Sequence, residues 1–248
     1  MMENLKEALE YVVELGLEAQ PTEVLEIAGK TYANRTLSRY DKPAYADAVK
    51  ASTLTALADY IENCAAEFRG NMIVHIVSPT RVRLMSELDA ERNREVLFEA
   101  NAETSEFQFD RWYDQETFMI SLQANFQMSG DLELVMKAAG NIERKNDQTF
   151  SDDGVTQVAT MKVGVAAKAD VMVPNPVELI PYRTFQEVPQ PASKFVFRIG
   201  DKEVPAFKIV EAEGGIWRNE AIGNIKDYLF TLMEEMDESI RNKITVIG

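Results

Sequence analysis

The stretch that decides the fold is "MIVHIVSPTRVRLMSEL", residues 72–88, together with "REVLFEANA", residues 94–102. In the first of these runs, Val82 and Leu84 alternate with two arginines. Alternation with a period of two is typical of an antiparallel strand that has one face buried and the other in water. The quoted runs therefore predict three strands, over residues 72–78, 80–88 and 94–102.

The basic side chains on the second of these strands make its exposed face a candidate binding surface. One interpretation is a local basic patch on this face and the following turn, formed by Arg81, Arg83, Arg92 and Arg94. The other is an ordinary solvated face and turn, in which the arginines pair with nearby acids. We favour the second interpretation, with Glu87, Glu91 and Glu95 as the acidic partners.

Helices are predicted on both sides of these strands, because apolar residues recur there at helical spacing. Asp114 and Asp131 each precede such a segment and can serve as its N-cap. In the longest helix the predicted buried stripe includes Cys64, which we interpret as a small core residue. The predicted helices cover residues 4–15, 44–68, 114–128, 131–142 and 217–236.

Further strands are predicted between the helices. Residues 22–37 form a hairpin with a glycine turn at Gly29, and later strands cover residues 155–165, 193–200 and 205–214. The order of elements predicts an α+β fold with mixed or antiparallel sheets and flanking helices rather than regular βαβ winding. We expect a single domain over residues 1–248, or two subdomains, 1–146 and 147–248.

Composition limits the classes of function. The chain has 248 residues, 46% of them hydrophobic, and a formal net charge of −15. A strongly negative protein repels phosphate, so the charge disfavours nucleic acid as a partner without excluding a local basic groove. No apolar run is long enough to span a membrane, and the acidic N-terminus does not resemble a secretory signal. We therefore expect a cytoplasmic protein with no membrane partner.

The small number of histidines and cysteines argues against the usual catalytic and metal sites. The chain has one histidine, His75, and one cysteine, Cys64. Zinc sites of the common type need three or four such ligands, and a nucleophilic triad would have to use His75, which lies in a predicted strand. "GKT", residues 29–31, lacks the preceding glycine of a phosphate-binding loop. We expect no cofactor, no metal and no enzymatic activity.

One acidic stretch, "FSDDGVTQVATM", residues 150–161, could suggest a metal site. If Gly154 took the sixth position of a calcium loop, threonines would stand where the first and twelfth ligands should be, so that motif is excluded. Asp152 and Asp153 could still join Asp147 at a magnesium site. The simpler interpretation, which we favour, is an acidic turn that leads into a strand.

The segment Val173–Pro191 contains five of the nine prolines of the chain. Proline cannot donate to a sheet, so we predict an extended arm that is neither a helix nor a central strand. The segment is too apolar to stay in water, and we expect it to be buried at a subunit interface, with cover by its own chain as the alternative. The expected interface residues are Val177, Leu179, Ile180, Tyr182, Phe185 and Val188.

Several quoted stretches together carry a family resemblance. "DDGVTQ" at 152–157, "VPNPVELIPYRTFQEVPQPASKFVFR" at 173–198 and "EGGIWRNEAIGNIKDYL" at 213–229 resemble the YfdQ-like family of phage and prophage proteins. "LKEALEYVVELG" at 5–16 and "ETFMISLQANF" at 116–126 fit the same resemblance. It implies a phage or prophage origin and a bacterial host cell, but no activity and no catalytic residues. Asp152, Asp153, Gly154, Arg183 and Trp217 would be family landmarks for folding.

Three functions remain as hypotheses. The first is a non-enzymatic phage protein that forms a homo-oligomeric assembly. The second is an accessory factor that binds single-stranded DNA in recombination or replication, with Phe109, Trp112 and Tyr113 stacking on bases near Arg111. The third is a counter-defence protein that sequesters a ligand or uses a metal held by carboxylates.

Overall fold

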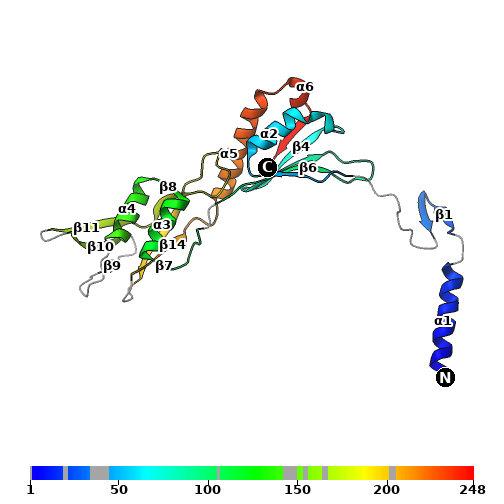
Figure 1. Cartoon of the computed structure of the whole chain (residues 1–248), viewed down its shortest axis with the longest axis horizontal. Coiled ribbons are helices and arrows are strands. Elements are labelled where there is room, and N and C mark those ends of the chain that lie inside the picture. Colours follow the sequence, from blue (N-terminus) through cyan, green and yellow to red (C-terminus); the bar gives the residue numbers. More distant parts are fainter. Residues whose placement is uncertain are drawn as a thin grey trace. The chain divides into compact units, whose positions relative to one another are not determined.

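A computed structural model describes residues 2–18, 22–33, 45–104, 107–141, 150–152, 156–163, 167–200 and 205–248. The chain divides into two compact units, Met1–Tyr45 and Ala46–Gly248. Helices and mixed and antiparallel sheets confirm the predicted α+β fold (Figure 1). The subdomain boundary considered at residues 146 and 147 falls outside the described residues.

The N-terminal unit contains a helix and a hairpin. Helix α1 covers Met2–Glu18, and strands β1 (Val24–Ile27) and β2 (Lys30–Ala33) pair in antiparallel register. The two turn residues, Ala28 and Gly29, both have positive φ, 52° and 72°. Positive φ at both central positions matches the twist of a two-residue hairpin, so the predicted helix and glycine turn are confirmed.

The second unit contains a five-stranded sheet of order β15-β4-β5-β6-β3. Its three central strands form an antiparallel meander, while the two edge strands run parallel to their neighbours. The three strands predicted from residues 72–102 are therefore confirmed. The strands cover Val49–Ala51 (β3), Met72–Ser78 (β4), Arg81–Ser86 (β5), Val96–Asn101 (β6) and Ile244–Ile247 (β15).

Helices α2 (Leu54–Asn63) and α5 (Trp217–Glu234) pack on one face of this sheet (Figure 1). Val74, Val82 and Leu84 point to that face and are fully buried. Because side chains alternate along a strand, the neighbouring residues of β4 and β5 point to the opposite face. The two helices thus leave the other face of the sheet free for polar side chains. A short helix, α6 (Glu238–Arg241), precedes β15.

The predicted long helix over residues 44–68 is wrong. Residues 49–51 instead form β3 beside β6, and α2 begins only after Thr53, whose hydroxyl accepts from Ala56 N at 3.2 Å. This side-chain cap competes with helix continuation toward the N-terminus. The helix ends at Cys64, and Ala65–Glu67 form a short 3-10 turn. Leu54, Leu57 and Ile61 of α2 are buried, while Cys64, which was predicted as a small core residue, is half-buried.

A second sheet in the same unit has the order β7-β14-β13-β12-β8 and its own core of phenylalanines. Helices α3 (Gln115–Asn125) and α4 (Gly130–Gly140) contact each other and this core. Strands β9 (Phe150–Asp152), β10 (Thr156–Val163) and β11 (Ala167–Pro174) form a separate small sheet. The five strands cover Tyr113–Asp114 (β7), Phe126–Gln127 (β8), Val177–Pro181 (β12), Ser193–Gly200 (β13) and Ala206–Glu211 (β14).

The two predicted helix caps have different outcomes. Asp114 caps α3 as predicted, because its carboxylate accepts from Thr117 N at 2.9 Å. The cap predicted at Asp131 is wrong, since Ser129 fills that position and accepts from Leu132 N at 3.2 Å. The carboxylate of Asp131 instead accepts from Glu178 N of β12 at 2.8 Å, so it ties the helix start to the sheet.

The proline-rich segment is more regular than predicted. Its residues 177–181 form β12, which pairs with β13 through Val177–Leu179 and with β8 through Ile180 and Pro181. The prediction that prolines prevent a strand with neighbours on both sides is therefore wrong. The prolines lie before the strand and at its last position, so the residues between them keep their N–H groups for the ladder.

Candidate functional site

The open face of the first sheet gathers most of the polar side chains that the sequence singled out. In the strand register, Lys50 of β3 pairs with Glu99 of β6, Glu99 with Arg83 of β5, and Arg83 with His75 of β4. Paired residues point to the same face of a sheet. Four charged or titratable side chains therefore form one row across the sheet, on the face that α2 and α5 do not cover.

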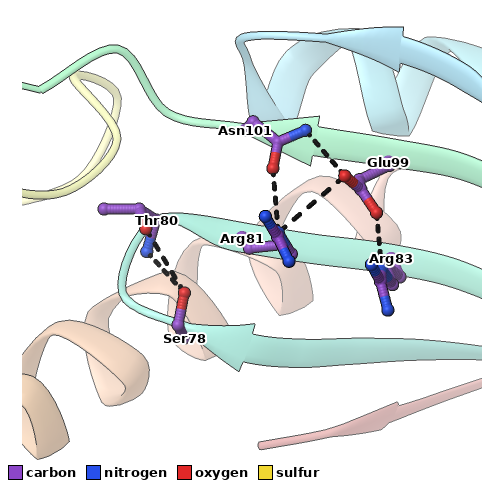
Figure 2. A network of polar contacts seen from close by, with 6 residues as sticks. All are labelled: Ser78, Thr80, Arg81, Arg83, Glu99 and Asn101. Atoms are coloured by element: carbon purple, nitrogen blue, oxygen red, sulfur yellow. Dashed lines mark hydrogen bonds and ion pairs between the residues drawn. The ribbon is translucent and has the colours of Figure 1, made fainter.

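Glu99 is the centre of a polar network on this face (Figure 2). Arg83 Nε donates to Glu99 Oε2 at 2.6 Å, and Asn101 Nδ2 donates to Glu99 Oε1 at 3.0 Å. Arg81 Nε donates to Asn101 Oδ1 at 3.0 Å and lies 3.8 Å from Glu99 Oε1. Ser78 and Thr80 form a further pair of hydroxyls, 3.3 Å apart, at the turn between β4 and β5.

The network keeps Glu99 ionised and leaves the arginine ends free. Hydrogen bonds from Asn101 and then Arg83 lower the pKa of Glu99, and its burial acts in the opposite direction. The side chains of Arg81 and Arg83 are 47% and 35% exposed. Their Nε atoms make the contacts, and within the described part of the chain their terminal Nη atoms have no hydrogen-bond partner.

The acids predicted to pair with these arginines lie elsewhere. Glu95 is buried, accepts from Ala46 N at 2.6 Å and lies 3.9 Å from Arg69 Nε. Arg94 Nη1 donates to the carbonyl of Ser86, the last residue of β5. The predicted acidic partners are therefore wrong for Arg81 and Arg83, which pair with Glu99 because the cross-strand register brings it beside Arg83. Glu99 was not among the predicted site residues, and its position between the apolar residues Phe98 and Ala100 is the sequence feature that could have indicated it.

The single histidine and cysteine lie on different elements. His75 is half-buried in β4 on the open face, and Cys64 lies at the C-terminal end of α2. Among the side chains that the structure describes, no group of three or more His, Cys, Asp or Glu residues could hold a metal ion.

The acidic stretch that could suggest a metal site is described only in part. Asp152 ends β9 and pairs in register with Gln157 of β10, which is the arrangement of two antiparallel strands. Asp147, Asp153 and Gly154 lie outside the described residues. The acidic turn, which we favoured over a magnesium site at these acids, therefore stays a prediction.

The aromatic residues expected to stack on bases are mostly inside the second core. Tyr113 is buried and stacks on Phe107 at 5.2 Å, and Phe109 stacks on Phe195 at 5.2 Å. Trp112 is 47% exposed, and Lys208 Nζ lies 5.1 Å from its ring centroid. The predicted cluster of exposed aromatics therefore does not form, because the apolar rings complete the core instead.

Arg183 joins two of the segments that carry the family resemblance. Its guanidinium carbon lies 4.0 Å from the ring centroid of Trp217, and its Nη1 lies 3.3 Å from Glu211 Oε1. It also donates to the hydroxyl of Ser193. Burial lowers the pKa of Arg183 to about 10, although Glu211 acts in the opposite direction. This cluster holds the chain after β12 against the start of α5, so its role is structural.

One pocket borders the loop before β7. Its volume is about 660 Å³, which is within the usual range for small-ligand sites. Arg111 Nη1 in its wall donates to Gln108 Oε1 at 2.6 Å. The polar lining residues Glu103, Gln108 and Arg111 are exposed, so the pocket is a wide surface depression.

Exposed apolar side chains are gathered in the N-terminal unit. In the part of this unit that the structure describes, nine large apolar side chains are 46–63% exposed. The helix and hairpin of the unit do not cover these side chains. They are Leu9, Tyr11, Val12, Val13 and Leu15 in α1, and Val24, Leu25, Ile27 and Tyr32 in the hairpin.

The expected interface residues of the proline-rich segment are largely covered by their own chain. Val177 and Leu179 are fully buried in the second core, and Phe185 and Val188 are buried in the first. Ile180 and Tyr182 are half-buried. These residues are buried without a second subunit. An interface between subunits must therefore include another surface of the chain.

Comparisons add no relative. The chain matches no protein-family model, no curated protein and no solved structure. Within the described residues, no helix is long and apolar enough to cross a membrane.

Proposed function

We propose that this chain is a non-enzymatic, phage- or prophage-encoded protein that forms a homo-oligomeric assembly through its N-terminal unit. The phage origin is supported by the resemblance of the quoted segments to the YfdQ-like family. The assembly is supported by one observation, the nine exposed apolar side chains of α1, β1 and β2. Exposed apolar surface that is gathered in one region marks interaction sites in proteins.

The N-terminal unit needs a covering surface to be stable. An isolated two-stranded hairpin is marginal in water, and a helix of 17 residues such as α1 is little better on its own. Covering a Val, Leu or Ile side chain fully contributes roughly 1.5–3 kcal/mol, which corresponds to an apolar area of roughly 60–120 Å². Because these nine side chains are 46–63% exposed, the set can bury on the order of 300–600 Å². That is a large part of the roughly 800 Å² per partner of stable complexes.

The charge pattern of α1 favours another protein surface as the cover. Leu9, Val12 and Val13 share one side of the helix, and Glu7, Glu10 and Glu14 lie on the other. Packing of the apolar side against a second copy leaves the glutamates in water. A negatively charged lipid surface would repel the same glutamates.

Substitutions on the two sides of α1 test this proposal. The variant Leu9→Gln/Val12→Gln/Val13→Gln should shift the protein from oligomer to folded monomer, measured as molar mass by light scattering after size exclusion. The matched control Glu7→Gln/Glu10→Gln/Glu14→Gln changes the opposite side and should remain oligomeric. If the wild type is oligomeric and the apolar variant keeps the same molar mass, the interface does not include this side of α1.

A further inference from the structure

We propose that the open face of the first sheet binds the phosphate backbone of a single-stranded nucleic acid through Arg81, Arg83 and Lys50. The proposal is independent of assembly through the N-terminal unit. It rests on the free ends of the two arginines, on the local charge of the face and on its shape.

The two arginines are oriented for phosphate. Each guanidinium uses Nε for the network around Glu99 and Asn101, while its Nη atoms form no hydrogen bond with a described residue. A planar fork whose stem is already held loses little freedom when it binds a phosphate with two parallel hydrogen bonds. The residues are two apart on one strand, so their stems lie roughly 6.5 Å from each other along it. Two successive phosphates of a strand can therefore be contacted together.

The face carries positive charge on a negative protein. On this row and at the position beside it, three cationic side chains accompany a single acid, Glu99. The cations are Lys50, Arg81 and Arg83. The whole chain, in contrast, has a net charge of −15. Lys50 is exposed and has no partner among the residues the structure describes. The surrounding field weakens the attraction of this face for phosphate, so the binding is expected at low salt and to fall steeply as salt increases.

The shape of the face favours a strand over a single phosphate ion. Lys50 and His75 stand on strands three positions apart, which is roughly 14 Å across the sheet. Ile247 pairs in register with His75, so it lies on the same face; it is 43% exposed and can contact an unstacked base. The described strands of this sheet place no aromatic ring on the open face, so recognition rests on the backbone and is independent of sequence.

Fluorescence anisotropy with a labelled 20-nucleotide oligo(dT) tests the proposal, over a series of salt concentrations. Each phosphate contact to a single strand contributes about −0.7 to the slope of log affinity against log salt, so three contacts predict a slope of about −2. Arg81→Gln/Arg83→Gln should lower the affinity at least about tenfold at low salt and reduce the slope by about 1.4. Arg92→Gln/Arg94→Gln, with the same net charge, should match the wild type.

A further variant should bind the oligonucleotide more tightly than the wild type. Glu99→Gln removes the acid that competes for both arginines while keeping a carbonyl that can accept from Arg83, so affinity should increase. Thermal unfolding confirms that each variant is folded, and Arg81→Lys/Arg83→Lys keeps the charge should the glutamine variant unfold. No binding by the wild type at low salt, or equal losses in the two arginine pairs, would overturn the proposal. Stronger binding to a duplex of the same length would overturn the assignment to single strands.

Discussion

Glu99 is the residue on which the polar face of the first sheet depends. Its carboxylate accepts hydrogen bonds from Arg83 and Asn101, and these contacts lower its pKa. A carboxylate held ionised in this way orients Arg83 directly, and it orients Arg81 through Asn101, whose amide oxygen accepts from Arg81 Nε. The same residue therefore links local stability to the proposed binding surface.

The pH dependence of stability should report this network. A carboxylate whose folded pKa lies below its unfolded value, about 4.3, stabilises the fold above that value, and the stabilisation is lost as pH falls through the folded pKa. We expect the free energy of unfolding to decrease less steeply from about pH 5 to about pH 3 in Glu99→Gln than in the wild type. Urea unfolding across this range measures the slope, with the exposed acid substitution Glu62→Gln as the control. Equal slopes in Glu99→Gln and the wild type would contradict a stabilising network.

Arg183 should matter for stability and not for binding. Its side chain is only 10% exposed, and its removal leaves Glu211 without its ion-pair partner and Trp217 without its covering cation. We expect Arg183→Ala to lower the free energy of unfolding by about 2–3 kcal/mol, less than the full cost of breaking a buried pair because Glu211 is 28% exposed. Arg218→Ala, on an exposed residue beside the same ring, should change it by about 0.5 kcal/mol or less. Chemical unfolding of both variants measures the difference, and equal effects would contradict a special role for Arg183.

Among the elements, β12 and the segment after it connect the two cores of the second unit. Thr184 Oγ1 donates to the carbonyl of Pro79 at 2.5 Å, and Glu187 Oε1 accepts from Thr55 N at 2.9 Å. Phe185 and Val188 then enter the core beneath α2 and α5. The apolar residues of this segment thus serve the folding of the protomer.

Substitution of the segment should therefore unfold the protein rather than dissociate it. Phe185 is 1% exposed, so Phe185→Ala should lower the free energy of unfolding by about 3–5 kcal/mol. Tyr182→Ala, at a half-buried position, should cost about 1 kcal/mol or less. Urea unfolding gives both values, and molar mass gives the assembly state. If Phe185→Ala gives a stable, fully folded monomer, this segment lies at the subunit interface and our interpretation is contradicted.

Elements set by local patterns could be predicted from the sequence, whereas those set by long-range pairing could not. The alternation around Val82 indicated β5, and the acid before α3 indicated its cap. The strand β3 was missed because its three residues gain a partner only from β6, far along the chain. Likewise, the basic face was recognisable from Arg81 and Arg83, but its acidic partner depended on the register between β5 and β6, which includes an irregularity after Leu84.

At the scale of the whole molecule, two surfaces with different chemistry separate assembly from binding. Helix α1 has an apolar side and an acidic side, while the open face of the first sheet is basic within a chain of net charge −15. Assembly through apolar contacts should persist or strengthen as salt increases, whereas phosphate binding should weaken. The two properties can therefore be measured independently in one protein.

The molar mass of the wild-type protein in solution tests the central claim most directly. The protomer has a mass of 28.0 kDa. We predict that sedimentation equilibrium over a range of concentrations gives a discrete multiple of this mass, which increasing salt does not reduce. A mass of one protomer at the highest concentration would contradict assembly through the N-terminal unit.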